Sequence, residues 1–207
     1  MKKIFFGLLL TLFFTAGFSQ VYYTLVPVEI GKAITPEHGF LPGKKFQFYP
    51  TIDKYDFSGL RIRAELYDLR DSLQIKKTDC SAVEINNQSE FRGPGGAQKV
   101  VAYFQTLCPQ SNILLDSSSR ETLKIYLEVL DARLIGFGEI TAHGLCKMTM
   151  KFKDLTKSYC IDITDKSPHS PIGKNAFVSR KTATRVIQSA SIREVIELFF
   201  IDLKAWQ

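Results

Sequence analysis

The chain has few of the residues and spacings from which catalytic and metal sites are built. It contains three histidines, His38, His143 and His169, and none is spaced from another as paired zinc ligands are. A Gly-x-Ser-x-Gly sequence is absent, which leaves out the nucleophile turn of α/β-hydrolases. The glycine-rich segment at 93–96 lacks the Lys-Ser or Lys-Thr of a phosphate-binding loop. We therefore expect no metal, no cofactor and no catalytic site formed by a local motif.

Long apolar runs are also lacking after the N-terminus. The apolar run at residues 4–14 follows two lysines and leads into small or polar residues that end at Ser19. This order predicts a secretory signal peptide over residues 1–19, cleaved before Gln20. An uncleaved membrane anchor is the alternative, but the run is shorter than the roughly 20 residues that span a bilayer. We expect a mature chain without a transmembrane segment, either in the periplasm or secreted.

Cysteine is scarce and is missing from the expected cleavage site, so lipid attachment has no sulfur there. The four cysteines are Cys80, Cys108, Cys146 and Cys160, without a Cys-x-x-Cys pair. An oxidising compartment permits disulfides. Strand phase places Cys146 and Cys160 on opposite faces of the sheet, so we expect no bond between them. If a bridge forms, we predict Cys80 with Cys108; four buried thiols are the alternative.

Strong charge of one sign is absent as well. The formal net charge is +6, and losing Lys2 and Lys3 with the signal peptide leaves 6 − 2 = +4 on the mature chain. Basic and acidic residues alternate along the chain and do not cluster with aromatics, so we expect no nucleic-acid partner. The modest basicity predicts a solvated surface that prefers acidic partners or anionic lipid headgroups.

An aromatic segment follows the signal peptide. Residues 20–57 are rich in aromatics, proline and glycine and show no helical period, which predicts an extended arm with strand pieces at 21–30 and 45–49. Pro27 restricts the first piece to an edge strand. Aromatics with interspersed lysines are typical of interface anchors, and a cover over one end of the core is the alternative. The candidate binding residues of the arm are Tyr22, Tyr23, Phe46, Phe48 and Tyr49.

Residues 58–207 show the periodicities of one α+β domain. Alternation of apolar and polar residues predicts strands over 60–66, 123–130, 146–153 and 159–164. Two shorter pieces are predicted at 82–85 and 113–115. Helical spacing predicts helices over 97–107, ended by Pro109, and over about 181–206. This order predicts a mixed or antiparallel sheet with two helices packed on one face.

The first of these strands ends in the charged segment Leu66-Tyr67-Asp68-Leu69-Arg70-Asp71. This segment and the order of elements over about 60–206 resemble the YajG-type bacterial envelope lipoproteins. They also resemble a wider group with the lipopolysaccharide-assembly protein LptE, the N-terminal domain of TolB and auxiliary lipoproteins of ABC transport systems. The lipobox cysteine of those lipoproteins is missing here, and the arm has no counterpart in them. The resemblance implies a non-catalytic periplasmic adaptor that acts by contact with other envelope components.

Two functional hypotheses follow. The first is an exported, non-enzymatic adaptor or binding module for an envelope protein or a lipidic ligand, which uses the arm and the sheet surface. Asp68, Arg70 and Asp71 are further candidate site residues as a paired-charge site, with a solvated turn as the alternative. The second hypothesis is a secreted hydrolase, with Asp68, Asp71, Glu139 and His143 brought together by the fold.

Overall fold

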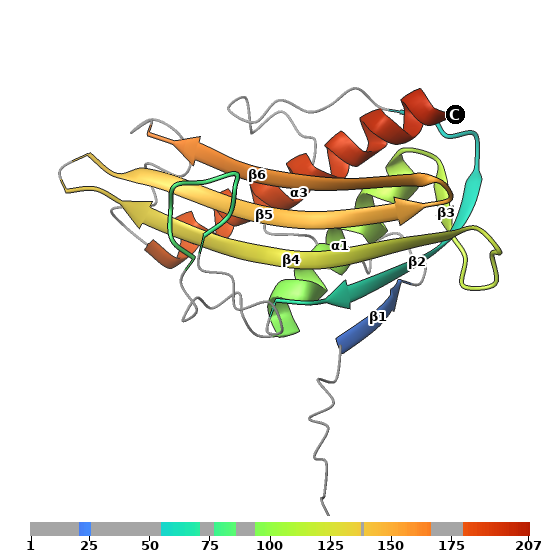
Figure 1. Ribbon diagram of the computed structural model, residues 1–207, viewed down its shortest axis with the longest axis horizontal. Helices are drawn as coiled ribbons and strands as arrows, with labels where there is room; N and C mark the ends of the chain where they lie inside the picture. The colour runs from blue at the N-terminus through green and yellow to red at the C-terminus, as the bar shows by residue number, and fades with distance from the viewer. Residues whose placement is uncertain (1–20, 26–54, 71–76, 86–93, 138, 167–179) are drawn as a thin grey trace, which may run out of the picture.

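Two helices lie on one face of a six-stranded sheet, as the computed structural model shows (Figure 1). The structure describes residues 21–25, 55–70, 77–85, 94–137, 139–166 and 180–207. The strands are β1 (Val21–Leu25), β2 (Leu60–Asp68), β3 (Ile113–Leu115), β4 (Thr122–Ile135), β5 (Thr141–Phe152) and β6 (Leu155–Asp165). The helices are α1 (Pro94–Gln110) and α3 (Arg180–Trp206). The predicted α+β class is confirmed.

The sheet is mixed, with the strand order β1-β2-β4-β5-β6 and with β3 paired to β2 off this path. β2 is parallel to β3 and to β4, whereas the pairs β1–β2, β4–β5 and β5–β6 are antiparallel. β1 lies at an edge, as Pro27 predicts for the first piece of the arm. Residues 26–54 of the arm lie outside the described residues.

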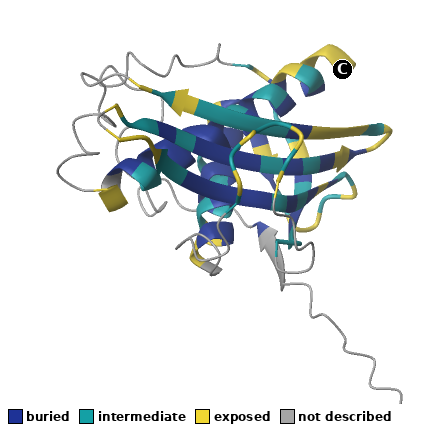
Figure 2. Ribbon diagram, turned by 60° about the vertical axis from the view of Figure 1, so that its left-hand side comes forward, coloured by how far each residue is buried: buried dark blue, intermediate teal, exposed yellow. Residues whose placement is uncertain are grey.

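The face under the helices holds the core, which occupies the middle of the strands (Figure 2). In β2, in β5 and in β4 up to Leu127, alternate residues are apolar and buried, which is the period expected of a half-covered sheet. The predicted strand phases are confirmed there, but the predicted inward position of Val129 is wrong, because a register shift in β4 turns Val129 outward and places Leu130 opposite Cys146 of the core. The buried residues on this face include Ile62, Ala64, Leu66, Leu123, Ile125, Leu127, Cys146, Met148, Met150 and Phe152.

α3 runs along β5 in the same direction as the strand. At one end, a Cβ on Gly144 would overlap the carbonyl oxygen of Ile187, so glycine permits the close approach of helix and strand. At the other end, the Phe152 and Trp206 rings meet edge to face with centroids 6.1 Å apart. The N-terminal end of α3 therefore lies at the end of the molecule where β5 begins.

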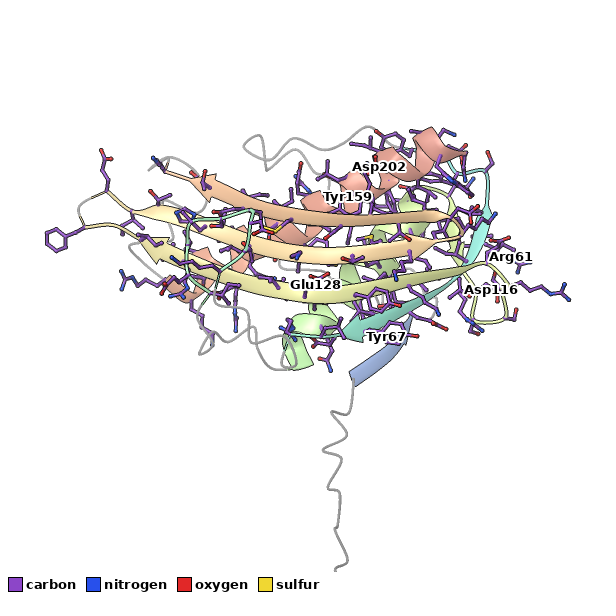
Figure 3. All side chains as sticks on the ribbon, viewed as in Figure 1. Arg61, Tyr67, Asp116, Glu128, Tyr159 and Asp202 are labelled. Carbon is purple, nitrogen blue, oxygen red and sulfur yellow. A yellow bond between two sulfur atoms is a disulfide. The ribbon has the colours of Figure 1, made fainter. Side chains whose placement is uncertain are left out.

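A hydrogen bond joins the C-terminal half of α3 to β6. The Tyr159 hydroxyl donates to Asp202 at 2.7 Å, and both side chains lie between the two elements (Figure 3). Burial, followed by this hydrogen bond, raises the pKa of Tyr159 above its usual range. Burial also raises the pKa of Asp202, but hydrogen bonds from Lys157 and Tyr159 outweigh burial and leave this pKa lowered.

Some predicted boundaries differ from the structure. α1 continues through Pro109 to Gln110, so the proline removes one backbone hydrogen bond in the last turn only. The Pro109 carbonyl accepts the backbone N–H of Asn112. The strand predicted at 82–85 is wrong, since this segment carries only an isolated bridge from Ser81 to Thr78. Neither described helix is both long and apolar enough to cross a membrane.

Candidate binding surface on the outer face of the sheet

The sheet face that points away from the helices, here the outer face, has a covered half and an open half. Residues 77–85, which we call the strap, cross in front of β4 and β5 near the end where β5 begins, and appear in green in Figure 1. The residues of β4, β5 and β6 toward the other end have no described segment in front of them in the same view. The two halves consequently present different chemistry.

The strap is fastened to β6 by two side-chain links. Cys80 forms a disulfide with Cys160, and the two cysteines are separated by 80 residues in the sequence. The Ser81 hydroxyl donates a hydrogen bond to Asp162 at 2.5 Å. Because Cys160 and Asp162 are two residues apart on β6, both links reach the same face of that strand.

A third link joins the strap to β4 and helps to close the space between the strap and the outer face of the sheet. The Arg133 guanidinium donates to the Glu84 carbonyl oxygen at 2.6 Å and to the Asp131 carboxylate at 3.2 Å. Asp131 is fully buried although its strand position faces outward, and so are Val129 and Leu145 nearby. The strap thus lies over an apolar strip of the outer face.

The predicted bridge from Cys80 to Cys108 is wrong. Cys108 lies on α1 inside the core as a free thiol, whereas the strap is on the other side of the sheet. Cys146 is also free and buried, on the face opposite Cys160 as predicted. Burial raises the pKa of both free thiols well above the usual range, which keeps them protonated and unreactive.

His143 and Asp162 form a cluster with Ser81, but its order is not that of a hydrolase triad. The His143 Nδ1 atom lies 3.1 Å from each oxygen of the Asp162 carboxylate. In a serine hydrolase the hydroxyl proton passes to the imidazole, whereas Ser81 donates to the carboxylate. The Ser81 oxygen also accepts the backbone N–H of Val83 at 3.0 Å. The cluster therefore holds the strap and does not present an activated nucleophile.

The predicted paired-charge residues at the end of β2 form a structural ion pair. Arg70 binds Asp68 through two hydrogen bonds of 2.7 and 2.6 Å. The two side chains are only 6% and 12% exposed, so the alternative of a solvated turn is wrong for this pair. Asp71 lies outside the described residues.

The residues predicted for a hydrolase are not brought together where the structure describes them. Asp68 pairs in register with Leu127, whose side chain is in the core, so Asp68 has the strand phase of the helix-covered face. His143 bonds to Asp162 on the outer face, and Glu139 is exposed in the turn before β5. Opposite faces of a sheet do not share a pocket.

A row of tyrosine and hydroxyl residues crosses the open half. The Tyr67 and Tyr126 rings stack with centroids 5.2 Å apart and planes 18° from parallel. Tyr22, a candidate of the arm, pairs with Tyr67 in the register of β1 and β2. Tyr23 is the next residue of β1, whereas Phe46, Phe48 and Tyr49 lie outside the described residues. In register, the row reads Tyr22, Tyr67, Tyr126, Thr149 and Ser158.

The neighbouring row places two lysines directly opposite each other. Lys124 of β4 pairs with Lys151 of β5, and both side chains are exposed. Lys151 Nζ lies 5.4 Å from the centroid of the Tyr126 ring. Like charges that face each other across strands destabilise a sheet. Within the described residues, neither lysine has a carboxylate in ion-pair distance, so the pair is open to an anion.

The acidic residues of the open half are engaged by other partners. Glu65 lies across from Lys124 in register, but its carboxylate binds Arg63 at 3.0 Å and accepts the Tyr67 hydroxyl at 3.0 Å. Glu128, in the middle of β4 in Figure 3, binds Lys147 at 2.9 Å and accepts Thr149 at 2.6 Å. These carboxylates are therefore held away from the lysine pair.

No known protein-family model matches the chain, and no curated protein matches it. Similarity therefore assigns no function, and the resemblance to the YajG-type lipoproteins stays a prediction. Within the described ranges, no group of three His, Cys, Asp or Glu side chains is placed to hold a metal ion.

The sequence analysis missed the residues of the open half that matter most here. Lys124 and Lys151 each appear as the polar member of an alternating strand, which indicates only that they face away from the core. Their opposition depends on the register of β4 with β5. The Tyr67 and Tyr126 stack depends in turn on the parallel pairing of β2 with β4. Two strands of equal period in the sequence do not fix that register.

Proposed function

We propose that the chain is an exported, non-enzymatic binding module that holds an acidic segment of another envelope protein against the open half of its sheet. The opposed pair Lys124 and Lys151 is the observation on which this proposal depends. An incoming carboxylate between the two ammonium groups replaces repulsion by attraction, so the pair favours the bound state more than the free state.

The shape of the surface favours an elongated partner over a small anion. From Tyr67 to Ser158, the tyrosine and hydroxyl row crosses four strands in register. Neighbouring strands lie about 4.8 Å apart, so this part of the row is roughly 14 Å long. Tyrosine combines apolar area with a hydroxyl at low conformational cost, which is why it is common in interfaces. The lysine pair lies beside this row and supplies the charge.

Export is supported by two independent features of the chain. The first is the order of lysines, apolar run and small residues over 1–19. The second is the disulfide from Cys80 to Cys160, because disulfides persist in oxidising compartments and are rare in the cytosol. Fractionation of cells that express the full chain tests this part: we expect an intact mass that begins at Gln20 in the exported fraction. Unprocessed chain confined to the cytosol would contradict export.

The binding surface is tested with a polyglutamate peptide as the acidic probe. Fluorescence anisotropy should show binding to the mature protein that weakens with salt, because exposed charges are screened. The double variant Lys124→Gln with Lys151→Gln should bind about tenfold more weakly. The matched control, Lys166→Gln with Arg180→Gln, removes the same charge at the far end of the molecule and should bind as the parent does. Equal losses in both double variants would reduce the effect to net charge and refute the site.

A further inference from the structure

The hairpin between β4 and β5 carries apolar side chains at its tip. Phe137 is fully exposed and Ile135 is about half exposed, in a turn that also contains Gly136. Single exposed apolar residues are common on protein surfaces, but two within three consecutive residues form a small exposed apolar patch. Figure 1 shows that this hairpin reaches farther out than the end of β6 beside it.

The tip is held in position by the strands that lead into it. β4 and β5 stay paired to their last residues, Ile135 with Thr141. Gly136 has φ of 124°, and a Cβ there would overlap the carbonyl oxygen of Glu139, so the turn is tight. The pairing of β4 with β5 therefore continues up to both sides of the turn.

Basic residues lie at the same end of the molecule as the hairpin, after β6 and at the start of α3. Lys166 follows Asp165, which pairs with Ala142 at the start of β5, and its side chain is exposed. Ile187 of α3 lies against Gly144, and Arg180 is seven residues earlier, which is about 10 Å toward the hairpin end. Among the described residues, the exposed cations at this end include Lys166, Arg180 and Lys181.

We propose that this hairpin end contacts a lipid bilayer with anionic headgroups, with Phe137 and Ile135 entering the interface and the basic residues lying at the level of the phosphates. Exposed apolar residues at the tip, with cations nearer the body of the molecule, match the order of layers in a membrane, where phosphates lie outside the acyl chains. This contact does not depend on the lysine pair proposed above, since the two surfaces lie at opposite ends of the strands.

A lipid surface fits the tip better than a protein pocket does. The tip offers apolar groups and backbone, whereas specific protein interfaces combine apolar anchors with a polar rim that forms hydrogen bonds. Glu139 is exposed in the same turn and opposes an anionic surface, as Asp165 does at the base. Among the described residues named here, three cations stand against these two carboxylates, 3 − 2 = +1, so the expected attraction is modest and the contact is reversible.

Vesicle flotation of the mature protein tests the proposal. We expect binding to vesicles of equal parts phosphatidylcholine and phosphatidylglycerol, and much less to phosphatidylcholine alone. Phe137→Ser should lower the partition coefficient about tenfold, because it removes most of the apolar area of the tip. Glu139→Gln should raise it. The matched control Leu114→Ser removes an exposed apolar side chain from β3 and should bind as the parent does.

A spectroscopic measurement locates the tip directly. Trp206 is the single tryptophan, so Phe137→Trp combined with Trp206→Phe gives one indole at the tip, and its emission should shift to the blue on anionic vesicles. The proposal is overturned if Phe137→Ser floats as the parent does or if the emission stays unchanged. It is also overturned if Phe137→Ser changes self-association without vesicles, which would indicate a second copy as the occupant. Polyglutamate binding by Phe137→Ser should equal that of the parent, so this test and the test of the proposed function fail separately.

Discussion

The two halves of the outer face share the same strands and differ in what their side chains bind. Under the strap, the polar groups are paired within the protein, as Asp162 is with Ser81 and His143. In the open half, Lys124 and Lys151 face each other without a carboxylate in ion-pair distance among the described residues. One half has been closed by the chain's own segment, and the other keeps a charge conflict that an external group can resolve. On the proposed function, the first half serves stability and the second serves binding.

Removing the disulfide under the strap should produce the largest change in stability and should leave binding at the open half unchanged. Cys80→Ala with Cys160→Ala should lower the free energy of unfolding by about 4 kcal/mol, because a loop of this length is no longer closed in the unfolded chain. Urea denaturation measures the loss. Reductant should lower the midpoint of the parent and leave the double variant unchanged. If polyglutamate binding fell together with stability, the two halves would not be separate in function.

The serine link of the strap should have a smaller effect. Ser81→Ala removes a hydrogen bond to the Asp162 carboxylate and should cost about 1 kcal/mol of unfolding free energy, since half-buried bonds to charged groups have this size. Ser158→Ala, on the open half of the same strand, is the matched control and should change stability by less than about 0.5 kcal/mol. Equal effects in the two variants would show that the strap adds nothing at this position.

The sequence predicted the helix-covered face well because burial has a period that the chain displays. Met148 and Met150 alternate with lysine and threonine. Once this segment is taken as a strand, the alternation determines which residues face the core. The prediction weakened where the phase is interrupted. β4 shifts register between Leu127 and Val129, so Val129 and Leu130 are both buried and alternation ends before the strand does. The predicted strand accordingly ended at 130, and the observed one ends at Ile135.

The outer face was predicted poorly because its features depend on pairing between distant segments. The strap has no regular spacing of apolar residues, and its few apolar residues led to the incorrect prediction of a strand at 82–85. The opposite phase of Cys146 and Cys160 was correct and already placed Cys160 on the outer face. What the sequence does not contain is the path of the loop that brings Cys80 to it. The burial of Gln188 and Arg193 was not predicted either, because these polar residues of α3 are covered by neighbours that the apolar stripe of the helix does not reveal.

The variant with the smallest predicted change in stability is the most informative about the open half, because it should stabilise the fold and weaken binding. Lys124→Gln should raise the free energy of unfolding by about 0.3 kcal/mol at low salt, since it relieves repulsion by Lys151. The gain should vanish at high salt. The same variant should weaken polyglutamate binding. Lys147→Gln is the matched control, because it breaks the pair with Glu128 and should not stabilise the fold. Ligand binding accounts for a surface residue that costs stability in the free protein and favours the bound one, and a loss of stability in Lys124→Gln would contradict the repulsion between the two lysines.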